Sequence, residues 1–104
     1  MMDIKDLTQA MYEFVSAKGW YEAGSPRPQT ARNIAISLCL ESAEVMEFFQ
    51  WGEHPPEKEL LAAELADVAL YLLQLASLSK IDLEAAIIKK LKDNYRRTWD
   101  QNNL

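Results

Sequence analysis

Two pairs of acidic residues occur at the same spacing in the middle of the sequence. Glu41 and Glu44 form the first pair, Glu64 and Asp67 form the second, and the acids of each pair follow the pattern acid-x-x-acid. At about 100° of rotation per helical residue, the members of a pair share one helix face. Glu41 and Glu64 each fall in the middle of an apolar stripe. Both pairs are therefore predicted to face the interior of a helical protein.

A cluster of inward-facing carboxylates predicts a cation among them. An unpaired buried carboxylate is strongly destabilising, and four packed together also repel one another. Oxygen ligands alone suit a hard divalent cation, and Mg²⁺ usually completes its coordination with water or phosphate oxygens. The pattern therefore favours metal-assisted phosphate chemistry over the alternative, in which these acids lie on a solvated flank of an amphipathic bundle.

Other motifs for metal or phosphate binding are missing from the sequence. A di-iron carboxylate bundle needs Glu-x-x-His pairs on two helices, whereas the one histidine, His54, stands in a turn before Pro55. The sequence contains no EF-hand loop and no glycine-rich phosphate loop. A bound metal, assisted by nearby cationic side chains, would then have to bind the phosphates.

The spacing of apolar residues predicts an all-α chain. Its 3 glycines and 4 prolines are few, and they fall between the apolar repeats. Four helices are expected: from Ile4 to Lys18, from an N-cap at Thr30 to about Gln50, from Glu57 to Ser79, and from an N-cap at Asp82 to about Thr98. Residues 1–104 are interpreted as a single all-α domain.

Charge and cysteine content narrow the class of protein. The net charge of −5 provides no positive field for a nucleic-acid backbone, so no nucleic acid polymer is expected as a partner. The longest unbroken apolar run, Val68 to Leu73, is too short for a membrane span, and no membrane partner is expected. The single cysteine, Cys39, forms no internal disulfide, which fits a reducing, cytoplasmic location.

The predicted third helix is apolar on two faces. Besides the stripe around Glu64, a second face carries small and branched side chains such as Leu65, Ala69 and Leu72. A helix that is apolar all round needs to be covered, and a chain of this length offers few elements to cover it. A homodimer or homotetramer is therefore expected, in which the helical bundle completes its core by homo-oligomerisation.

Two segments resemble the signature of a known enzyme family. ESAEVMEFFQW, from Glu41 to Trp51, and ELADVALYLLQLA, from Glu64 to Ala76, are similar to the paired E-x-x-E and E-x-x-D motifs of that family. The family is the all-α nucleoside triphosphate pyrophosphohydrolases of the MazG type, and the resemblance is strongest to its small dCTP pyrophosphatase-like branch. Supporting matches are Glu13-Phe14, Trp20, Arg32-Asn33 and KLKDNYRR at 90–97. A four-helix MazG-like bundle is expected from this resemblance.

The resemblance implies a reaction, a metal and a set of residues. The reaction is Mg²⁺-dependent hydrolysis of (deoxy)nucleoside triphosphates to monophosphate and pyrophosphate, in nucleotide-pool clean-up, with Mn²⁺ as a substitute metal. The residues that match the metal ligands are Glu41, Glu44, Glu64 and Asp67. Glu41, Glu44 and Glu47 are alternatives for the group that activates water. A catalytically inactive helical oligomer, acting as a binding or regulatory module, is the alternative function.

The candidate phosphate ligands are basic or amide side chains. Lys90, Asn94 and Arg97 share one face of the fourth predicted helix, and together with Arg32 and Asn33 they could hold a triphosphate. Basic residues near a helix C-terminus are also favoured by the helix dipole, so a solvated basic flank is the alternative.

The candidate base-binding residues are mostly aromatic. Trp20 and Trp51 flank predicted helices and could stack on a base, whereas Tyr71 and Phe48 could line the pocket or pack in the core. Met11 is placed in the base pocket, at a position where relatives of the dCTP branch often carry histidine. Because polar groups for the base edge are scarce in this prediction, a looser base preference is expected, with dCTP-like substrates still favoured.

Overall fold

The computed structural model describes residues 1–54 and 56–97. These residues form four α-helices and no strand: α1 (Ile4–Ala17), α2 (Ala31–Glu47), α3 (Lys58–Leu78) and α4 (Leu83–Arg96). The predicted all-α class is confirmed, and each helix lies within a few residues of its predicted bounds. α2 ends shortly before the expected Gln50, in a turn over residues 48–51, and the expected end of α4 near Thr98 lies outside the described residues.

Side-chain caps fix the first residues of α1, α2 and α4. Asp3 and Asp6 form a reciprocal capping box at the start of α1, with hydrogen bonds of 3.1 and 2.9 Å. Thr30 Oγ1 and Asp82 Oδ1 each accept a hydrogen bond of 3.1 Å from a backbone N–H in the first turn that follows. Each such cap stabilises its helix by about 1 kcal/mol because it satisfies an otherwise unpaired amide group. The predicted N-caps Thr30 and Asp82 are confirmed.

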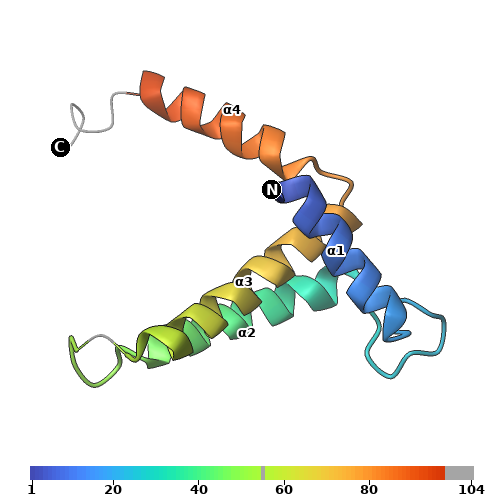
Figure 1. The fold of residues 1–104 in the computed structure, drawn as a ribbon, viewed down its shortest axis with the longest axis horizontal. Coiled ribbons are helices and arrows are strands. Elements are labelled where there is room, and N and C mark those ends of the chain that lie inside the picture. Colours follow the sequence, from blue (N-terminus) through green and yellow to red (C-terminus); the bar gives the residue numbers. More distant parts are fainter. Residues whose placement is uncertain (55, 98–104) are drawn as a thin grey trace.

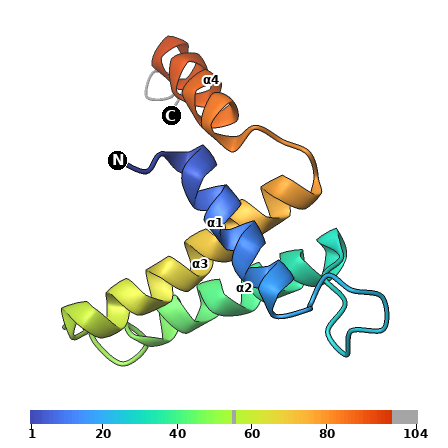
Figure 2. The same ribbon diagram turned by 45° about the vertical axis from the view of Figure 1, so that its right-hand side comes forward.

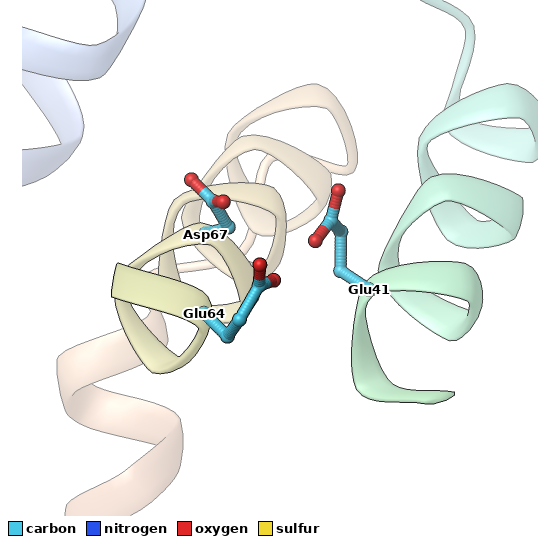
Figure 3. A group of neighbouring side chains, drawn as sticks. All are labelled: Glu41, Glu64 and Asp67. Atoms are coloured by element: carbon cyan, nitrogen blue, oxygen red, sulfur yellow. The ribbon is translucent and has the colours of Figure 1, made fainter. Parts of the chain in front are cut away.

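α2 and α3 form the framework of the molecule. The two helices run antiparallel and lie side by side along most of their length (Figure 1, Figure 2). This antiparallel arrangement places the acidic motif of α2 beside that of α3 (Figure 3). α1 packs across α3 near the opposite end of the pair (Figure 2).

The buried core lies where α1 packs on the α2–α3 pair. Its apolar members are Met11, Val15, Ile34, Leu73 and Ala76. This core is small, since many large apolar side chains elsewhere on the described helices remain exposed. The radius of gyration is 16.8 Å, whereas a compact chain of this length has about 13 Å. A single copy therefore leaves much of its apolar surface uncovered.

α4 extends away from the α2–α3 pair (Figure 1). None of the residues in α4 is buried, and the helix lies closest to α1. Its apolar side chains Ile87, Ile88 and Leu91 are exposed on one face. Three helices thus form the core, and the fourth presents an apolar face that the described part of this chain does not cover.

α3 is the most apolar of the four helices. By length and composition alone it could cross a membrane, although core helices of soluble proteins meet the same criterion. Little of it is buried within one copy. In the structure it pairs along its length with α2, and Glu64 and Asp67 lie near Glu41 of that helix (Figure 3). The sequence and the structure therefore both indicate an apolar face of α3 that one copy leaves exposed.

Candidate active site

Glu41 of α2 faces Glu64 and Asp67 of α3 across the gap between the two helices (Figure 3). One carboxylate oxygen from each residue lies within 4.8 Å of the other two. The antiparallel pairing brings the two acidic motifs level with each other, and one helical turn separates Glu64 from Asp67 so that both reach the same side. The structure therefore brings together three of the four predicted metal ligands.

Glu44 and Glu47 follow Glu41 at successive turns of α2. Both side chains are exposed, and neither belongs to the group of three facing oxygens. Glu44 nevertheless lies close enough to raise the pKa of both Glu41 and Glu64. Glu44 thus borders the cluster, while Glu47 lies at the end of the helix.

Two oxygens of the cluster are enclosed without a hydrogen-bond partner. They are Glu41 Oε2 and Glu64 Oε2, and the described residues supply no donor to either of them. A buried carboxylate oxygen without a donor destabilises the protein unless a cation or another donor reaches it. Because the three facing groups offer only oxygen atoms, this arrangement fits a hard divalent cation such as Mg²⁺.

Burial and mutual repulsion oppose ionisation of these carboxyl groups. Loss of solvation raises the pKa of Glu41 to about 7, and the neighbouring Glu64 and Glu44 carboxyl groups add to the rise. Burial likewise raises the pKa of Glu64, with additional repulsion from Glu44 and Asp67. Near neutral pH the cluster without metal therefore holds a proton, which a cation would have to displace.

A cavity of about 550 Å³ adjoins the cluster, and Glu41 and Asp67 form part of its wall. Its other walls come from α1, the loop before α2, and both paired helices. The remaining lining residues are Met11, Phe14, Val15, Trp20, Pro26, Arg27, Pro28, Gln29, Asn33, Ile34, Ser37, Leu70, Tyr71 and Gln74. A volume of this size suits a small organic ligand whose charged end reaches the carboxylates.

Several predicted substrate residues do meet at this cavity. Trp20, Asn33 and Tyr71 line it, as does Met11. The Trp20 ring packs edge-to-face on Phe14, with centroids 5.7 Å apart, which fixes its orientation at the cavity wall. Asn33 donates through Nδ2 to the carbonyl of Pro28 at 2.9 Å and thereby ties α2 to the preceding loop.

Other predicted substrate residues lie elsewhere. Trp51 is 91% exposed and is not part of the cavity wall. Arg32 contacts the site indirectly, since its Nη1 donates to Asn33 Oδ1 at 3.3 Å. Phe48 is half-buried outside the cavity, at the C-cap of α2. The remaining three do not line the cavity: Lys90 and Asn94 in α4, and Arg97 at its C-cap.

Gln74 and Gln29 line the cavity although the sequence pattern did not single them out. Gln74 is only 3% exposed, and its Nε2 donates to Gln29 Oε1 at 2.7 Å and to the Tyr21 hydroxyl at 3.3 Å. A signal was present, because Gln74 stands inside an apolar run two helical turns after Asp67 and on the same face. With Ser37 also in the wall, the expectation that polar groups are scarce here is wrong.

An all-α chain whose two acidic motifs face each other across antiparallel helices has the arrangement expected of the MazG-type pyrophosphohydrolases. No family model matches the chain. Individual proteins do match: dCTP pyrophosphatase 1 of Homo sapiens is 32% identical over 103 residues, which covers 90% of this chain. The proteins of the same name from Rattus norvegicus and Mus musculus are each 31% identical over the same share.

These relatives confirm the resemblance that the acidic motifs indicate. The similarity extends over nearly the whole chain rather than over the two motifs alone. The chain is therefore similar to the dCTP pyrophosphatases, the branch of the MazG-type proteins that its acidic motifs resemble. The chain spans only 58% of the length of these relatives.

Proposed function

We propose that the protein hydrolyses (deoxy)nucleoside triphosphates to the monophosphate and pyrophosphate, with dCTP-like nucleotides as preferred substrates. The observation that carries the proposal is the cluster of three facing carboxylates in contact with an open cavity. Glu41 and Asp67 belong to both, so a ligand in the cavity would extend its charged end toward the cluster. The relatedness to dCTP pyrophosphatases supports this reaction over other phosphate chemistry.

Glu41, Glu64 and Asp67 would hold a divalent cation, Mg²⁺ or in its place Mn²⁺, with Glu44 as a further ligand at the edge of the cluster. When bound, the cation neutralises charge on the phosphate chain and activates it toward attack by water. The enclosed oxygens of Glu41 and Glu64 support this assignment because they have no donor of their own.

The same acidic face of α2 would supply the group that activates water. Glu44 is exposed and stands one turn from Glu41, outside the three facing oxygens, so its carboxylate can orient a water and accept a proton from it. Glu47, a further turn along the helix, is the second candidate for this role, and Glu41 is the third.

Trp20 and Tyr71 would hold the base, because both line the cavity beside Met11. Asn33 and the neighbouring Arg32 would reach the sugar or the phosphates from the start of α2. The prediction that Lys90, Asn94 and Arg97 bind the triphosphate requires these residues to come from a second copy. None of them lines the cavity of its own chain, and α4 extends away from the α2–α3 pair (Figure 1). Trp51 would need a second copy in the same way.

A homodimer or homotetramer is proposed on separate grounds. The apolar residues Leu65 and Leu72 on α3 and Leu91 on α4 are exposed, and the core of a single copy is small. Packing one copy on another would remove this surface from water, which stabilises the oligomer by about 25 cal/mol per Å² of apolar surface buried.

Ala69→Glu is expected to produce monomers in sedimentation equilibrium, whereas the matched Ala63→Glu on a different face of α3 retains the oligomer. A wild-type monomer at micromolar concentration would contradict this proposal.

The proposed cellular role is removal of unwanted nucleotides from the cytoplasmic pool.

The reaction is tested by incubating the protein with Mg²⁺ and a panel of NTPs and dNTPs, with products separated by ion-exchange chromatography. Monophosphate and pyrophosphate in equal amounts are expected, and a Glu64→Gln variant serves as the inactive control. Diphosphate with orthophosphate would indicate a different bond cleavage. No turnover with any nucleotide would favour a catalytically inactive binding module.

A further inference from the structure

Gln74 is a buried polar side chain at the cavity wall whose hydrogen bonds leave one atom unused. Its Nε2 donates to Gln29 Oε1 and to the Tyr21 hydroxyl, which occupies both of its N–H groups. Its Oε1 has no hydrogen-bond partner among the described residues. That atom is also not one of the enclosed, unpartnered oxygens, which in the described residues belong to Glu41 and Glu64. Gln74 Oε1 is therefore an accessible acceptor at the cavity.

The orientation of the Gln74 amide is fixed by a chain of hydrogen bonds that begins at a backbone carbonyl. The carbonyl of Arg27 can only accept, so Gln29 must present Nε2 to it, as it does at 2.8 Å. Gln29 must then present Oε1 to Gln74, at 2.7 Å. Turning the Gln74 amide around would set two oxygens against each other, and Gln29 cannot turn without losing its bond to Arg27. The hydrogen bonds therefore keep Gln74 Oε1, rather than Nε2, available as the acceptor.

We propose that Gln74 selects the base: its Oε1 accepts a hydrogen bond from the exocyclic amino group of a cytosine held between Trp20 and Tyr71. This inference rests on the proposed function. Uracil and thymine carry a carbonyl oxygen where cytosine carries the amino group, so they would place an acceptor against the locked acceptor of Gln74. Gln74 stands two turns, or roughly 10 Å, along α3 from Asp67, a distance that separates the base from the reacting phosphate end.

The discrimination expected from this contact is substantial. Leaving a buried acceptor facing another acceptor destabilises a complex by an amount that corresponds to about a 10- to 100-fold change in affinity. The wild-type protein should therefore show a kcat/KM for dCTP that exceeds that for dUTP by about this factor. The looser base preference expected from the sequence would then hold only for bases that also present an amino group to Gln74.

Gln74→Met tests the proposal, because methionine keeps the length of the side chain and its helical propensity while removing both polar atoms. The expected result is a 10- to 100-fold loss of kcat/KM for dCTP, through KM, with little change for dUTP. Leu73→Met is the matched control: it makes the same kind of replacement at the adjacent buried position, which is not part of the cavity wall, and should leave the dCTP/dUTP ratio as in the wild type.

Gln29→Leu tests whether Gln29 fixes the orientation of the Gln74 amide. Without Gln29 the Gln74 amide can turn and donate to a carbonyl, so the dCTP/dUTP ratio should fall toward 1 because dUTP improves. Circular dichroism melts of each variant report whether the fold is retained. An unchanged ratio in folded Gln74→Met would overturn the proposal, as would equal losses for both nucleotides.

Binding of non-hydrolysable α,β-imido analogues of dCTP and dUTP, measured by calorimetry with Mg²⁺, separates this inference from the proposed function. Tighter binding of the dCTP analogue, lost in Gln74→Met, supports the role of Gln74 even if no nucleotide is turned over. Equal binding of both analogues by the wild-type protein would refute the role of Gln74 even if the reaction is confirmed.

Discussion

The two ends of the cavity differ in how their polar atoms are satisfied. At the acidic end, Glu41 and Glu64 have enclosed oxygens without donors and carboxyl groups with raised pKa values. At the other end, Gln74 and Gln29 form a directional hydrogen-bond chain in which every donor of Gln74 is used. The first arrangement is destabilising without a cation or another donor, whereas the second is already ordered. We therefore expect the reaction at the end with unpartnered oxygens, and base selection at the end with ordered hydrogen bonds.

The largest effect should come from breaking the acidic end. Glu64→Gln removes a charge from the three facing carboxylates, and loss of metal-assisted catalysis worth several kcal/mol should lower kcat/KM at least about a thousandfold for every nucleotide. Glu59→Gln, on an exposed turn of the same helix, is the control and should retain activity. Steady-state assays of pyrophosphate release measure both. Substantial activity in Glu64→Gln would show that this group is not part of the metal site.

Removing the stacking surface should give the next largest effect, without altering selection. Trp20→Ala is expected to raise KM for dCTP and dUTP by a similar factor, equivalent to about 1 to 3 kcal/mol of lost stacking. Trp51→Ala provides the comparison, because Trp51 lies outside the cavity of its own chain. An equal rise in KM for Trp51→Ala would mean that a second copy brings this ring to the site. A changed dCTP/dUTP ratio in Trp20→Ala would contradict the separation of stacking from selection.

The raised pKa of Glu41 predicts how Mg²⁺ binding depends on pH. Because the pKa of this carboxyl group is about 7, the proton competes with the metal below neutral pH. The apparent affinity for Mg²⁺ should therefore weaken by up to about tenfold for each pH unit below 7 and level off above 8. Calorimetric titrations at pH 6 and pH 8 check this, and equal affinities at the two values would contradict it.

The same carboxyl group should make the metal-free protein less stable as the pH rises. Folding raises the pKa of Glu41 from its ordinary value of 4.5 to about 7, so the folded state binds the proton more tightly than the unfolded chain does. Stability in EDTA should fall as the pH rises from about 4.5 to 7. Glu41→Gln should raise the melting temperature by several degrees at pH 8 and by little at pH 5. A lower melting temperature for Glu41→Gln at pH 8 would show that Glu41 serves the fold.

The smallest effect is expected far from both ends of the cavity. Lys80 follows α3 with a φ of 57°, in the left-handed region, and the next amide N–H, that of Ile81, donates to the carbonyl of Ala76 at 2.9 Å. Glycine takes this conformation without the steric penalty of a Cβ atom. Lys80→Gly should raise the free energy of unfolding by up to about 1 kcal/mol and leave kcat/KM unchanged. Urea denaturation measures the first and a turnover assay the second.

The helices and the acidic end of the cavity could be predicted from the sequence because the signals are local. The caps at Thr30 and Asp82 and the position of Glu41 within an apolar stripe each depend on residues a few positions apart. Glu41 and Glu64 then face each other as soon as the two adjacent helices pack on their apolar sides. A short-range pattern was therefore sufficient to predict the contact between the acidic motifs.

The hydrogen bonds of Gln74 at the other end of the cavity, and the position of α4, could not be predicted in the same way. The bond between Gln74 and Gln29 joins α3 to an irregular loop, and no periodicity determines where that loop lies. The apolar pattern of α4 predicted a helix but not its direction, because the direction depends on which surface covers Leu91. Trp51 was predicted to stack on the base because of its residue type and its position beside a helix. Neither property indicates whether the side chain is buried.

The proposed division of the cavity into a reacting end and a selecting end is tested most directly by kcat/KM for dCTP and dUTP. These values are measured as pyrophosphate release with Mg²⁺ in the wild-type protein, Glu64→Gln and Gln74→Met. We predict that Glu64→Gln lowers both values by the same large factor and keeps their ratio, whereas Gln74→Met brings the ratio close to 1 by reducing the value for dCTP. A ratio that changes in Glu64→Gln and stays constant in Gln74→Met would contradict the division of the cavity into a reacting end and a selecting end.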